Sequence, residues 1–244
     1  MPTSIAKPRT RSREASDPHL LKIFHSLLDH FGPRSWWPAD HPWEMMVGAI
    51  LTQNTAWTNV EKALANLKKA RSLNLKKVAQ MPRRSLERLI RPAGFFRQKA
   101  ERLREFARLL VAEPVFYRQL LGKVPADLPP LRTKLLAVKG IGPETADSIL
   151  LYAGSYATFV VDAYTRRIGQ RYGLFKFADY DQVQDFFHQR LPIKAPLYNE
   201  FHALLVELAK RYCRSQNPAC AICPLVGSCA HGSIQAGSSR SGKD

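Results

Sequence analysis

The protein has 244 residues, of which 45% are hydrophobic, so the chain is long and apolar enough to bury a sizeable core. Charged residues make up 23%, which excludes a chain that is disordered as a whole. Lys and Arg number 37 against 20 Asp and Glu, which gives a formal net charge of +17. This excess indicates a polyanionic partner and nucleic acid first, although a merely basic protein shows the same balance.

The sequence shows no sign of a membrane span or a secretory leader. It has no run of about 18 apolar residues, and its N-terminus has no apolar signal core. We therefore expect no membrane partner and a place in the cytoplasm of a bacterium or archaeon. Residues 1–16 and 232–244 are polar and rich in Ser, Gly, Lys and Arg, and we expect both to be loose tails.

Helical periodicity dominates the rest of the chain, and no segment alternates convincingly as a strand would. An apolar stripe follows Asp17 and Pro18, a favourable helix start. Residues 42–57 begin with Pro42 and are apolar on nearly all sides through Leu51, which predicts a buried core helix. Further helices are predicted over residues 59–70, 75–80, 84–90, 96–112, 130–137, 144–154, 163–172, 179–190 and 196–213. The predicted fold class is all-α.

The positive charge is concentrated in one part of the chain. Between Glu61 and Glu105 there are 14 Lys and Arg but only 4 Asp and Glu, interleaved with apolar residues at helical spacing. This pattern predicts helices with one basic face, which suits contact with phosphates.

The segment VKGIGPETADSILLYA, residues 138–153, places two glycines one residue apart before a helix. Glycine can take a positive φ and bring the backbone close to a ligand, and free N–H groups at a helix start attract anions. Gly140, Ile141 and Gly142 could therefore offer backbone donors to a phosphate. Because no strand precedes the loop and a third glycine is missing, it is not a dinucleotide fingerprint. A plain corner between two helices remains the alternative.

All four cysteines lie near the C-terminus, separated by six, two and five residues. They are Cys213, Cys220, Cys223 and Cys229. Such a cluster in a chain without a secretory signal indicates a metal centre rather than disulfides. Four thiolates suit tetrahedral zinc or an iron–sulfur cluster. Zinc ribbons usually pair two Cys-x₂-Cys knuckles and this chain has one, which favours iron–sulfur.

The cysteine spacing resembles the [4Fe–4S] loop of the endonuclease III family of DNA glycosylases. The strings VKGIGPETA and VVDAYTRRIGQR together resemble the helix–hairpin–helix, Gly-Pro and Asp signature of that superfamily, known as HhH-GPD. The resemblance implies a [4Fe–4S] cluster on the four cysteines, a hairpin that grips a DNA phosphate, and a catalytic aspartate at Asp162. An aspartate at a helix start is also a common N-cap, and both roles can hold at once.

The resemblance also implies an arrangement of two helical lobes around a DNA-binding cleft. We expect a helical barrel over residues 42–155 that ends in the hairpin. Residues 17–41 and 156–231 would form the lobe that holds the cluster, with Asp162 in the cleft. The implied partner is double-stranded DNA with a damaged base, bound by a monomer.

Glu144 departs from one branch of the family. In bifunctional members, a lysine two residues after the second glycine forms a Schiff base with the sugar. Here Gly142 is followed by Pro143 and Glu144, and a carboxylate cannot form an imine. We therefore expect no efficient lyase, although Lys139 is a possible stand-in. A carboxylate in the first helical turn also suits the helix dipole, which is the ordinary explanation.

An enzyme that acts on a base in duplex DNA flips it out and needs a residue to fill the gap. Gln53 and Asn54 form a polar corner after the core helix. By the resemblance, one of them would be this wedge, with a helix C-cap as the alternative.

Three of the four tryptophans, Trp36, Trp37 and Trp57, flank the same core helix. Flat electron-rich rings suit a cationic, alkylated purine, although ordinary core packing remains the alternative. The strings WWP, GAILTQNT and RPAGFFRQKA resemble the 3-methyladenine glycosylases of endonuclease III type. That resemblance implies a base pocket lined by Trp36, Trp37, Pro38, Trp57, Glu144 and Lys210. The best-known members of the branch lack the cysteine loop, so the damaged base stays open.

The sequence thus predicts a base-excision DNA glycosylase that uses Asp162 and water, with alkylated purines as its first candidate substrates. One rival is a bifunctional endonuclease III acting on oxidised pyrimidines. The other is a non-catalytic iron–sulfur protein that binds DNA structures.

Overall fold

The structure is a computed structural model that describes residues 16–34 and 36–233. Every regular element in these residues is helical and none is a strand, which confirms the all-α prediction. No helix in the described part of the chain is both long and apolar enough to cross a membrane. The tails predicted over residues 1–16 and 232–244 lie almost entirely outside the described residues.

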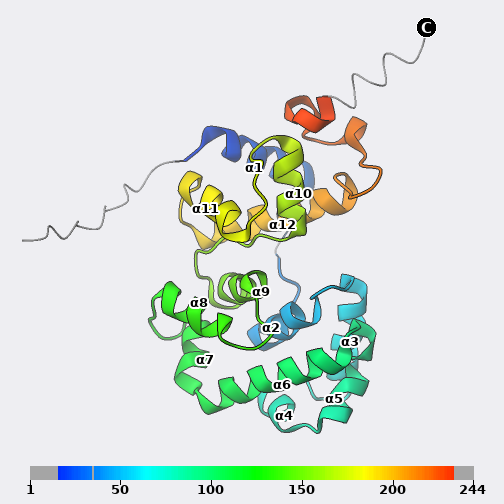
Figure 1. The fold of residues 1–244 in the computed structure, drawn as a ribbon, viewed down its shortest axis with the longest axis vertical. Helices are drawn as coiled ribbons and strands as arrows, with labels where there is room; N and C mark the ends of the chain where they lie inside the picture. Colours follow the sequence, from blue (N-terminus) through cyan, green and yellow to red (C-terminus); the bar gives the residue numbers. More distant parts are fainter. Residues whose placement is uncertain (1–15, 35, 234–244) are drawn as a thin grey trace, which may run out of the picture.

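Two helical lobes lie one above the other (Figure 1). The lower lobe contains α2 (Pro42–Leu51), α3 (Trp57–Lys69), α4 (Leu75–Gln80), α5 (Arg83–Leu89), η1 (Arg91–Ala93), α6 (Phe96–Ala112), α7 (Pro114–Leu120), α8 (Leu128–Leu136) and α9 (Pro143–Ser148). The upper lobe contains α1 (Pro18–Phe31), α10 (Ala163–Tyr172), α11 (Tyr180–Arg190) and α12 (Ala195–Arg211), with the short turns η3 (Cys220–Ile222) and η4 (Val226–Ser228). Each lobe has its own hydrophobic core.

Helix α2 is the centre of the lower core, as its apolar sequence predicts. Every residue from Trp43 to Leu51 is buried, and the helix contacts α3, α6 and α9. Burying a large apolar side chain contributes roughly 1.5–3 kcal/mol. The sequence predicts that this helix runs to residue 57, but it ends at Leu51. The chain turns there because Asn54 takes a φ of 52°, and α3 then starts at Trp57.

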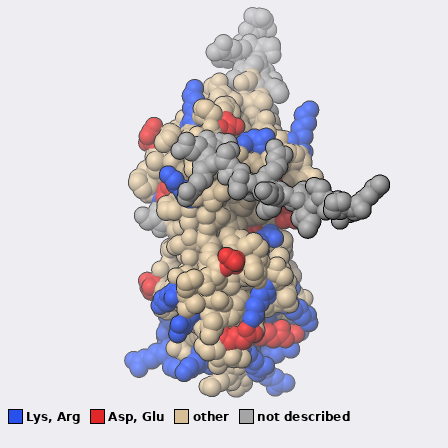
Figure 2. Space-filling view, turned by 90° about the vertical axis from the view of Figure 1, so that its left-hand side faces the viewer, with Lys and Arg blue, Asp and Glu red and all other residues tan. Residues whose placement is uncertain are grey.

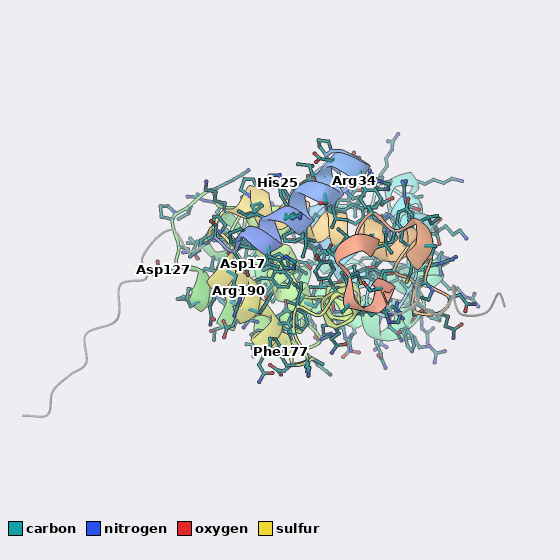
Figure 3. The ribbon with its side chains drawn as sticks, turned by 90° about the horizontal axis from the view of Figure 1, so that it is seen from above. Asp17, His25, Arg34, Asp127, Phe177 and Arg190 are labelled. Carbon is teal, nitrogen blue, oxygen red and sulfur yellow. The ribbon has the colours of Figure 1, made fainter. Side chains whose placement is uncertain are left out.

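The upper core forms where α1 packs on α12. Asp17 caps α1 by accepting a hydrogen bond from the His19 N–H at 2.9 Å, as the Asp-Pro start predicts. The Asp17 N–H donates to the carbonyl of Arg190 at 2.7 Å, which joins the start of α1 to the end of α11 (Figure 3).

One helical rod passes from the lower core into the upper core. A single α-helix over 144–154 was predicted, but α9 gives way at Ser148 to a π-helical turn, η2 (Ile149–Ala153). Ile149 belongs to the lower core and Leu151 to the upper core, while Tyr152 packs against both. The wider π turn changes the direction in which successive side chains point, and such turns are frequent at functional sites.

A buried carboxylate on this rod ties the two lobes together. Asp147 is fully buried and accepts two hydrogen bonds from Arg132 of α8, at 2.9 and 3.1 Å. It also accepts from the Tyr180 hydroxyl at 2.9 Å and the Gln184 amide at 2.9 Å, both on α11. The Thr158 hydroxyl lies 3.2 Å away. A buried charge is tolerated only when it is compensated in this way, so the network fixes α8 against α11 through α9.

Replacing Asp147 with Asn should destabilise the protein by about 3–5 kcal/mol, because it leaves the Arg132 charge without its buried partner. The control is Asp181→Asn, since Asp181 also pairs with Arg132 at 3.4 Å but its side chain is 73% exposed. That change should cost at most about 1 kcal/mol. Chemical denaturation of both variants measures the difference, and equal losses would contradict the assigned role of Asp147.

Lys99 of α6 is a second buried charge, and it fastens the end of α2. Lys99 is 1% exposed, and its Nζ donates to the carbonyls of Leu51 and Ala93, each at 2.8 Å. Burial, and then repulsion from Arg102, lowers the pKa of Lys99 to about 8. The ammonium thus joins the end of α2 to the turn that precedes α6.

Stability should rise with pH above about pH 8, because folded Lys99 then loses its proton while the unfolded chain keeps it until about pH 10.4. One such proton gives a slope of up to about 1.4 kcal/mol per pH unit. Denaturation of wild type and Lys99→Met across this range isolates the slope, since other groups contribute equally to both. Parallel curves would contradict the lowered pKa.

Candidate functional site

Asp162 stands at the start of α10, where the two lobes meet. Its Oδ1 accepts the Thr165 N–H at 2.7 Å and so caps the helix. The preceding residues, Val160 and Val161, are buried in the upper core, which fixes the approach to the helix. The side chain is 13% exposed, so the carboxylate is almost enclosed.

Two residues that the sequence analysis did not identify lie behind Asp162. The Nε2 of His202, on α12, is 3.5 Å from the Asp162 Oδ2. The Nδ1 of His202 is hydrogen-bonded to the hydroxyl of Tyr152, on η2. In the sequence, His202 is recognisable only as a histidine on the apolar face of α12. Such a residue is usually part of the core, so the pattern alone did not single it out.

The charge of Asp162 is set by two opposing effects. Burial acts to raise the pKa of the carboxyl group, but the interactions with His202 and Thr165 together outweigh it. The net pKa lies below its ordinary value. Asp162 is therefore a carboxylate at neutral pH, which can stabilise positive charge or activate water.

Glu144 lies in the first turn of α9, and its charge interacts with that of Asp162. Removal from water, and then repulsion from Asp162, raises the pKa of Glu144, while His202 and Arg166 act in the opposite direction. The residue itself remains exposed, so it stands at the surface of the site and not in its interior.

The glycine loop forms a tight hairpin between α8 and α9. Gly140 has a φ of 85°, and any side chain there would collide with Arg102. The side chain of Ile141 anchors the loop in the lower core, and its N–H donates to Val138 at 3.0 Å. Gly142 is exposed at the start of α9, where the helix directs free N–H groups outward.

Gln53 and Asn54, the two candidates for the wedge, have different surroundings in the structure. The Gln53 amide donates to the Gly140 carbonyl and the Thr145 hydroxyl, each at 2.9 Å, and accepts from Arg102 at 2.8 Å. Gln53 thereby holds the hairpin in shape. Asn54 is exposed and left-handed, with a φ of 52°, so its side chain is the freer of the two.

Phe95 is a further exposed residue that the sequence analysis missed. It is the N-cap residue that precedes α6, is 58% exposed and has a φ of 44°. A left-handed conformation is costly for a bulky residue, and such strain collects at functional sites. Lys99 binds the carbonyls of Leu51 and Ala93, which holds this turn beside the end of α2 and thus near Asn54.

The three predicted tryptophans come together in one half-buried aromatic group. The ring of Trp37 lies 5.8 Å from that of Trp36 and 5.2 Å from that of Trp57. It also lies 5.4 Å from Tyr152, which links this group to His202 and Asp162. Gly48 of α2 leaves room for the indole of Trp37, because an added Cβ would be 3.3 Å from its Nε1.

Helix α12 supplies a cation to the aromatic group. Lys210 is exposed, and its Nζ is 5.2 Å from the centre of the Trp36 ring. Arg34 anchors the segment before the tryptophans, since its N–H donates to Glu200 at 2.6 Å. Pro38, the last of the predicted pocket residues, follows Trp37 and is exposed.

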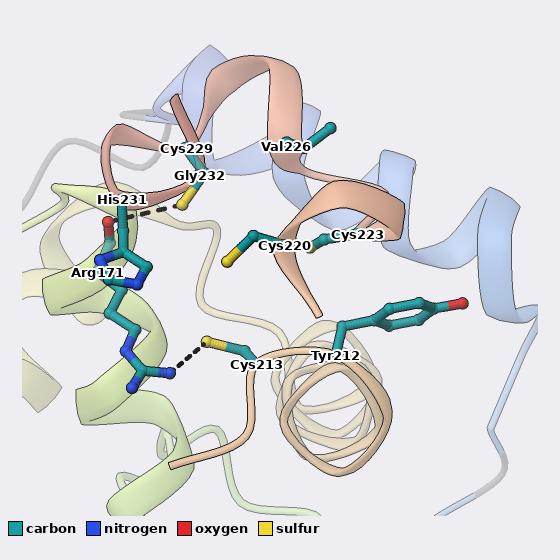
Figure 4. A pocket seen from close by; sticks show the side chains of 9 residues that line it. All are labelled: Arg171, Tyr212, Cys213, Cys220, Cys223, Val226, Cys229, His231 and Gly232. Carbon is teal, nitrogen blue, oxygen red and sulfur yellow. Dashed lines mark hydrogen bonds between the residues drawn. The ribbon is translucent and has the colours of Figure 1, made fainter. Parts of the chain in front are cut away.

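The four cysteines are free thiols that line one cavity beside α10 (Figure 4). Arg171 fixes the loop from α10 by donating to the carbonyls of Arg214 at 2.6 Å and Ser215 at 2.9 Å. Within the described ranges, no three His, Cys, Asp or Glu side chains converge closely enough to hold a single metal ion. The donor set fits an iron–sulfur cluster, in which each iron takes its own thiolate.

The basic residues of the lower lobe lie at the surface, as their spacing predicts. On the face of the molecule seen in Figure 2, Lys and Arg side chains gather over the lower lobe. Lys69, Arg71, Lys76, Arg84 and Arg88, on or between α3 and α5, are exposed. Such a surface attracts a polyanion without reading its sequence.

Comparisons with known proteins show the family of this chain. A family model described as the HhH-GPD superfamily base excision DNA repair protein matches residues 47–192. A protein of Methanocaldococcus jannaschii, named as a candidate DNA repair glycosylase, is 44% identical over 86% of this chain and 95% of its own length. Endonuclease III of Thermotoga maritima is 30% identical over 77% of this chain and 82% of its own.

Solved structures show the same fold. The 3-methyladenine DNA glycosylase MagIII of H. pylori, bound to 1,N6-ethenoadenine, is 34% identical with a TM-score of 0.68, over 79% of this chain and 96% of that one. A trapped endonuclease III–DNA covalent intermediate has a TM-score of 0.74 over 90% of this chain and 98% of that one, at 21% identity. The resemblance seen in the sequence is confirmed: the chain belongs to the HhH-GPD superfamily of base excision DNA repair proteins.

Proposed function

We propose that this protein is a monofunctional DNA glycosylase that takes a damaged base out of duplex DNA and hydrolyses its glycosidic bond. The observation that carries the proposal is the nearly enclosed carboxylate of Asp162, linked through His202 and Tyr152 to the aromatic group. Relatives named as DNA glycosylases support the same class of activity.

Asp162 supplies the chemistry that this reaction needs. As the bond to the base breaks, the base leaves with the bonding electrons and the sugar gains positive charge. A charged carboxylate stabilises that cation, and water then adds at the sugar carbon and loses a proton. The lowered pKa of Asp162 keeps the group ionised at neutral pH.

The aromatic group favours an alkylated or etheno-modified purine as the substrate. Trp36, Trp37 and Trp57 offer flat faces for stacking, and such faces attract a cationic base more than a neutral one. The glycosylase of H. pylori, with a bound modified adenine, supports this choice among the possible bases.

Glu144 favours hydrolysis over lyase chemistry. It stands where bifunctional relatives carry the nucleophilic lysine, and it cannot form an imine. Lys139, the alternative nucleophile, has a side chain that is 80% exposed and lies 3.6 Å from Glu101. This ammonium is therefore largely in water, in a loose surface ion pair, which supports hydrolysis over lyase chemistry.

Duplex DNA would be held at three places. Gly140 and Gly142 offer their hairpin to a phosphate, with the helix start behind it. Asn54 fills the space left by the flipped base, and Phe95 is the apolar group best placed to enter the stack beside it. The basic lower lobe adds sequence-independent attraction.

We also propose a [4Fe–4S] cluster on Cys213, Cys220, Cys223 and Cys229. When bound, the cluster supplies four iron–thiolate bonds that hold the C-terminal loop together. Arg171 and Arg167 tie this loop to α10, the helix that begins at Asp162. The cluster would thus support the position of the helix that carries the carboxylate.

The activity is tested on duplex oligonucleotides that carry 3-methyladenine, 1,N6-ethenoadenine, uracil or thymine glycol. Strand breaks should appear only after alkali, with no adduct trapped by borohydride. Asp162→Asn should lower base release by at least about 100-fold, since it removes the charge that stabilises the sugar cation. Asp185→Asn, an exposed carboxylate on α11, is the control and should leave the rate unchanged.

A trapped adduct with breaks before alkali would instead identify a bifunctional enzyme. Binding of DNA without release of any base, and with no effect of Asp162→Asn, would identify the non-catalytic protein.

The metal centre is tested by iron and sulfide analysis of protein purified without oxygen. We expect about four irons and four sulfides per chain, as the formula of the cluster requires. Cys223→Ser should lose most of the iron, whereas Ser233→Ala in the same region should keep it. About one zinc per chain, with no sulfide, would contradict the proposal.

A further inference from the structure

His202 is a buried polar group that the packing of α12 does not explain. The residue is 5% exposed, and its neighbours Phe201, Leu204 and Leu205 belong to the upper core. Among the described residues, its Nε2 has no hydrogen-bond partner and instead faces the Asp162 Oδ2 at 3.5 Å. The nearest polar neighbour of this buried ring nitrogen is therefore the Asp162 carboxylate, which indicates a role tied to that group.

Tyr152 determines which nitrogen of His202 carries the proton. Burial, and then the charges of Asp162 and Glu200, raises the pKa of this phenol well above its ordinary value, so the hydroxyl keeps its proton. The hydroxyl can therefore donate to the Nδ1 of His202. In a neutral imidazole the proton then lies on Nε2, which points toward Asp162.

The two oxygens of Asp162 thus contact two different helices. Oδ1 accepts the Thr165 N–H of α10 at 2.7 Å, and Oδ2 faces His202 of α12. The carboxylate is therefore restrained against rotation while its charge is retained. Tyr152 also touches Trp37, so the ring that orients His202 forms a wall of the aromatic group.

Other charged groups lie near this pair. Glu144 of α9 interacts with Asp162 and His202, Arg166 of α10 with Glu144, and Glu200 of α12 with Tyr152. Glu144 repels Asp162, whereas Arg166 offsets the charge of Glu144. Interactions with His202 and with Thr165 act to lower the pKa of Asp162.

We propose that His202 is a positioning residue for Asp162 and is oriented by Tyr152. These three side chains form one row of contacts, called the relay below, that joins the base pocket to the carboxylate. This inference rests on the proposed glycosylase function. His202 does not touch the base or the sugar in this scheme, but acts through the carboxylate.

The test measures single-turnover base release against pH in the complete, cluster-loaded protein. His202→Phe keeps a ring but removes both nitrogens, so the rate should fall about 10- to 100-fold. The acidic limb of the profile should move to higher pH, because burial of Asp162 is then opposed only by its hydrogen bonds with Thr165. Affinity for a duplex with an uncleavable abasic analogue should change by less than about threefold.

Two further variants separate positioning from packing. His202→Gln keeps a donor near the place of Nε2, so it should regain part of the rate. Tyr152→Phe keeps the contact with Trp37 but removes the hydroxyl, and should move the acidic limb less than His202→Phe does. A folded His202→Phe with the wild-type rate and limb, or His202→Gln no better than His202→Phe, would overturn the proposal. Circular dichroism confirms folding, and Tyr152→Phe carries the test if the His202 variants do not fold.

A second measurement does not depend on activity. Nitrogen shifts of ¹⁵N-labelled histidine rings should show His202 protonated on Nε2 in the wild type. Tyr152→Phe and Asp162→Asn should each change this signal, and unchanged shifts would overturn the relay. If no base is released but the shifts respond, the proposed function fails and the relay stands. If bases are released and the shifts do not respond, the relay alone fails.

Discussion

The arrangement of the whole site depends on a carboxylate that water does not reach. Asp147 lies at the junction of the lobes and binds Arg132 on one side and Tyr180 and Gln184 on the other. The Tyr180 hydroxyl also accepts the Val161 N–H at 3.4 Å, one residue before Asp162. A compensated buried charge is costly to disturb, so the angle between the lobes and the approach to Asp162 are fixed together.

The rod that carries Asp147 also connects two parts of the proposed reaction. Its start forms one wall of the glycine hairpin, which Gln53 and Arg102 of the lower lobe brace. Its end places Tyr152 between the aromatic group and His202. A phosphate held at one end and a base held at the other would therefore sit at a set separation, which a flexible connection could not maintain.

Charge is arranged in two layers around this frame. Exposed cations of the lower lobe provide long-range attraction for a polyanion, which weakens as salt increases. At the site itself, the carboxylate of Asp162 is nearly enclosed and Glu144 stands at the surface beside it. The excess of basic residues therefore suits binding of a polyanion, while the two carboxylates suit the proposed hydrolysis.

The sequence by itself determined the helical class, the buried α2, the basic lower lobe and the family, because these follow from local periodicity and from motifs with fixed spacing. The grouping of Trp36, Trp37 and Trp57 also followed once the family was recognised. Only the tertiary structure decided that Gln53 braces the hairpin while Asn54 is free, and that Tyr152 and His202 stand behind Asp162. These contacts join residues distant in sequence, and they depend on how helices pack and on the π turn that rotates Tyr152, which no local pattern specifies.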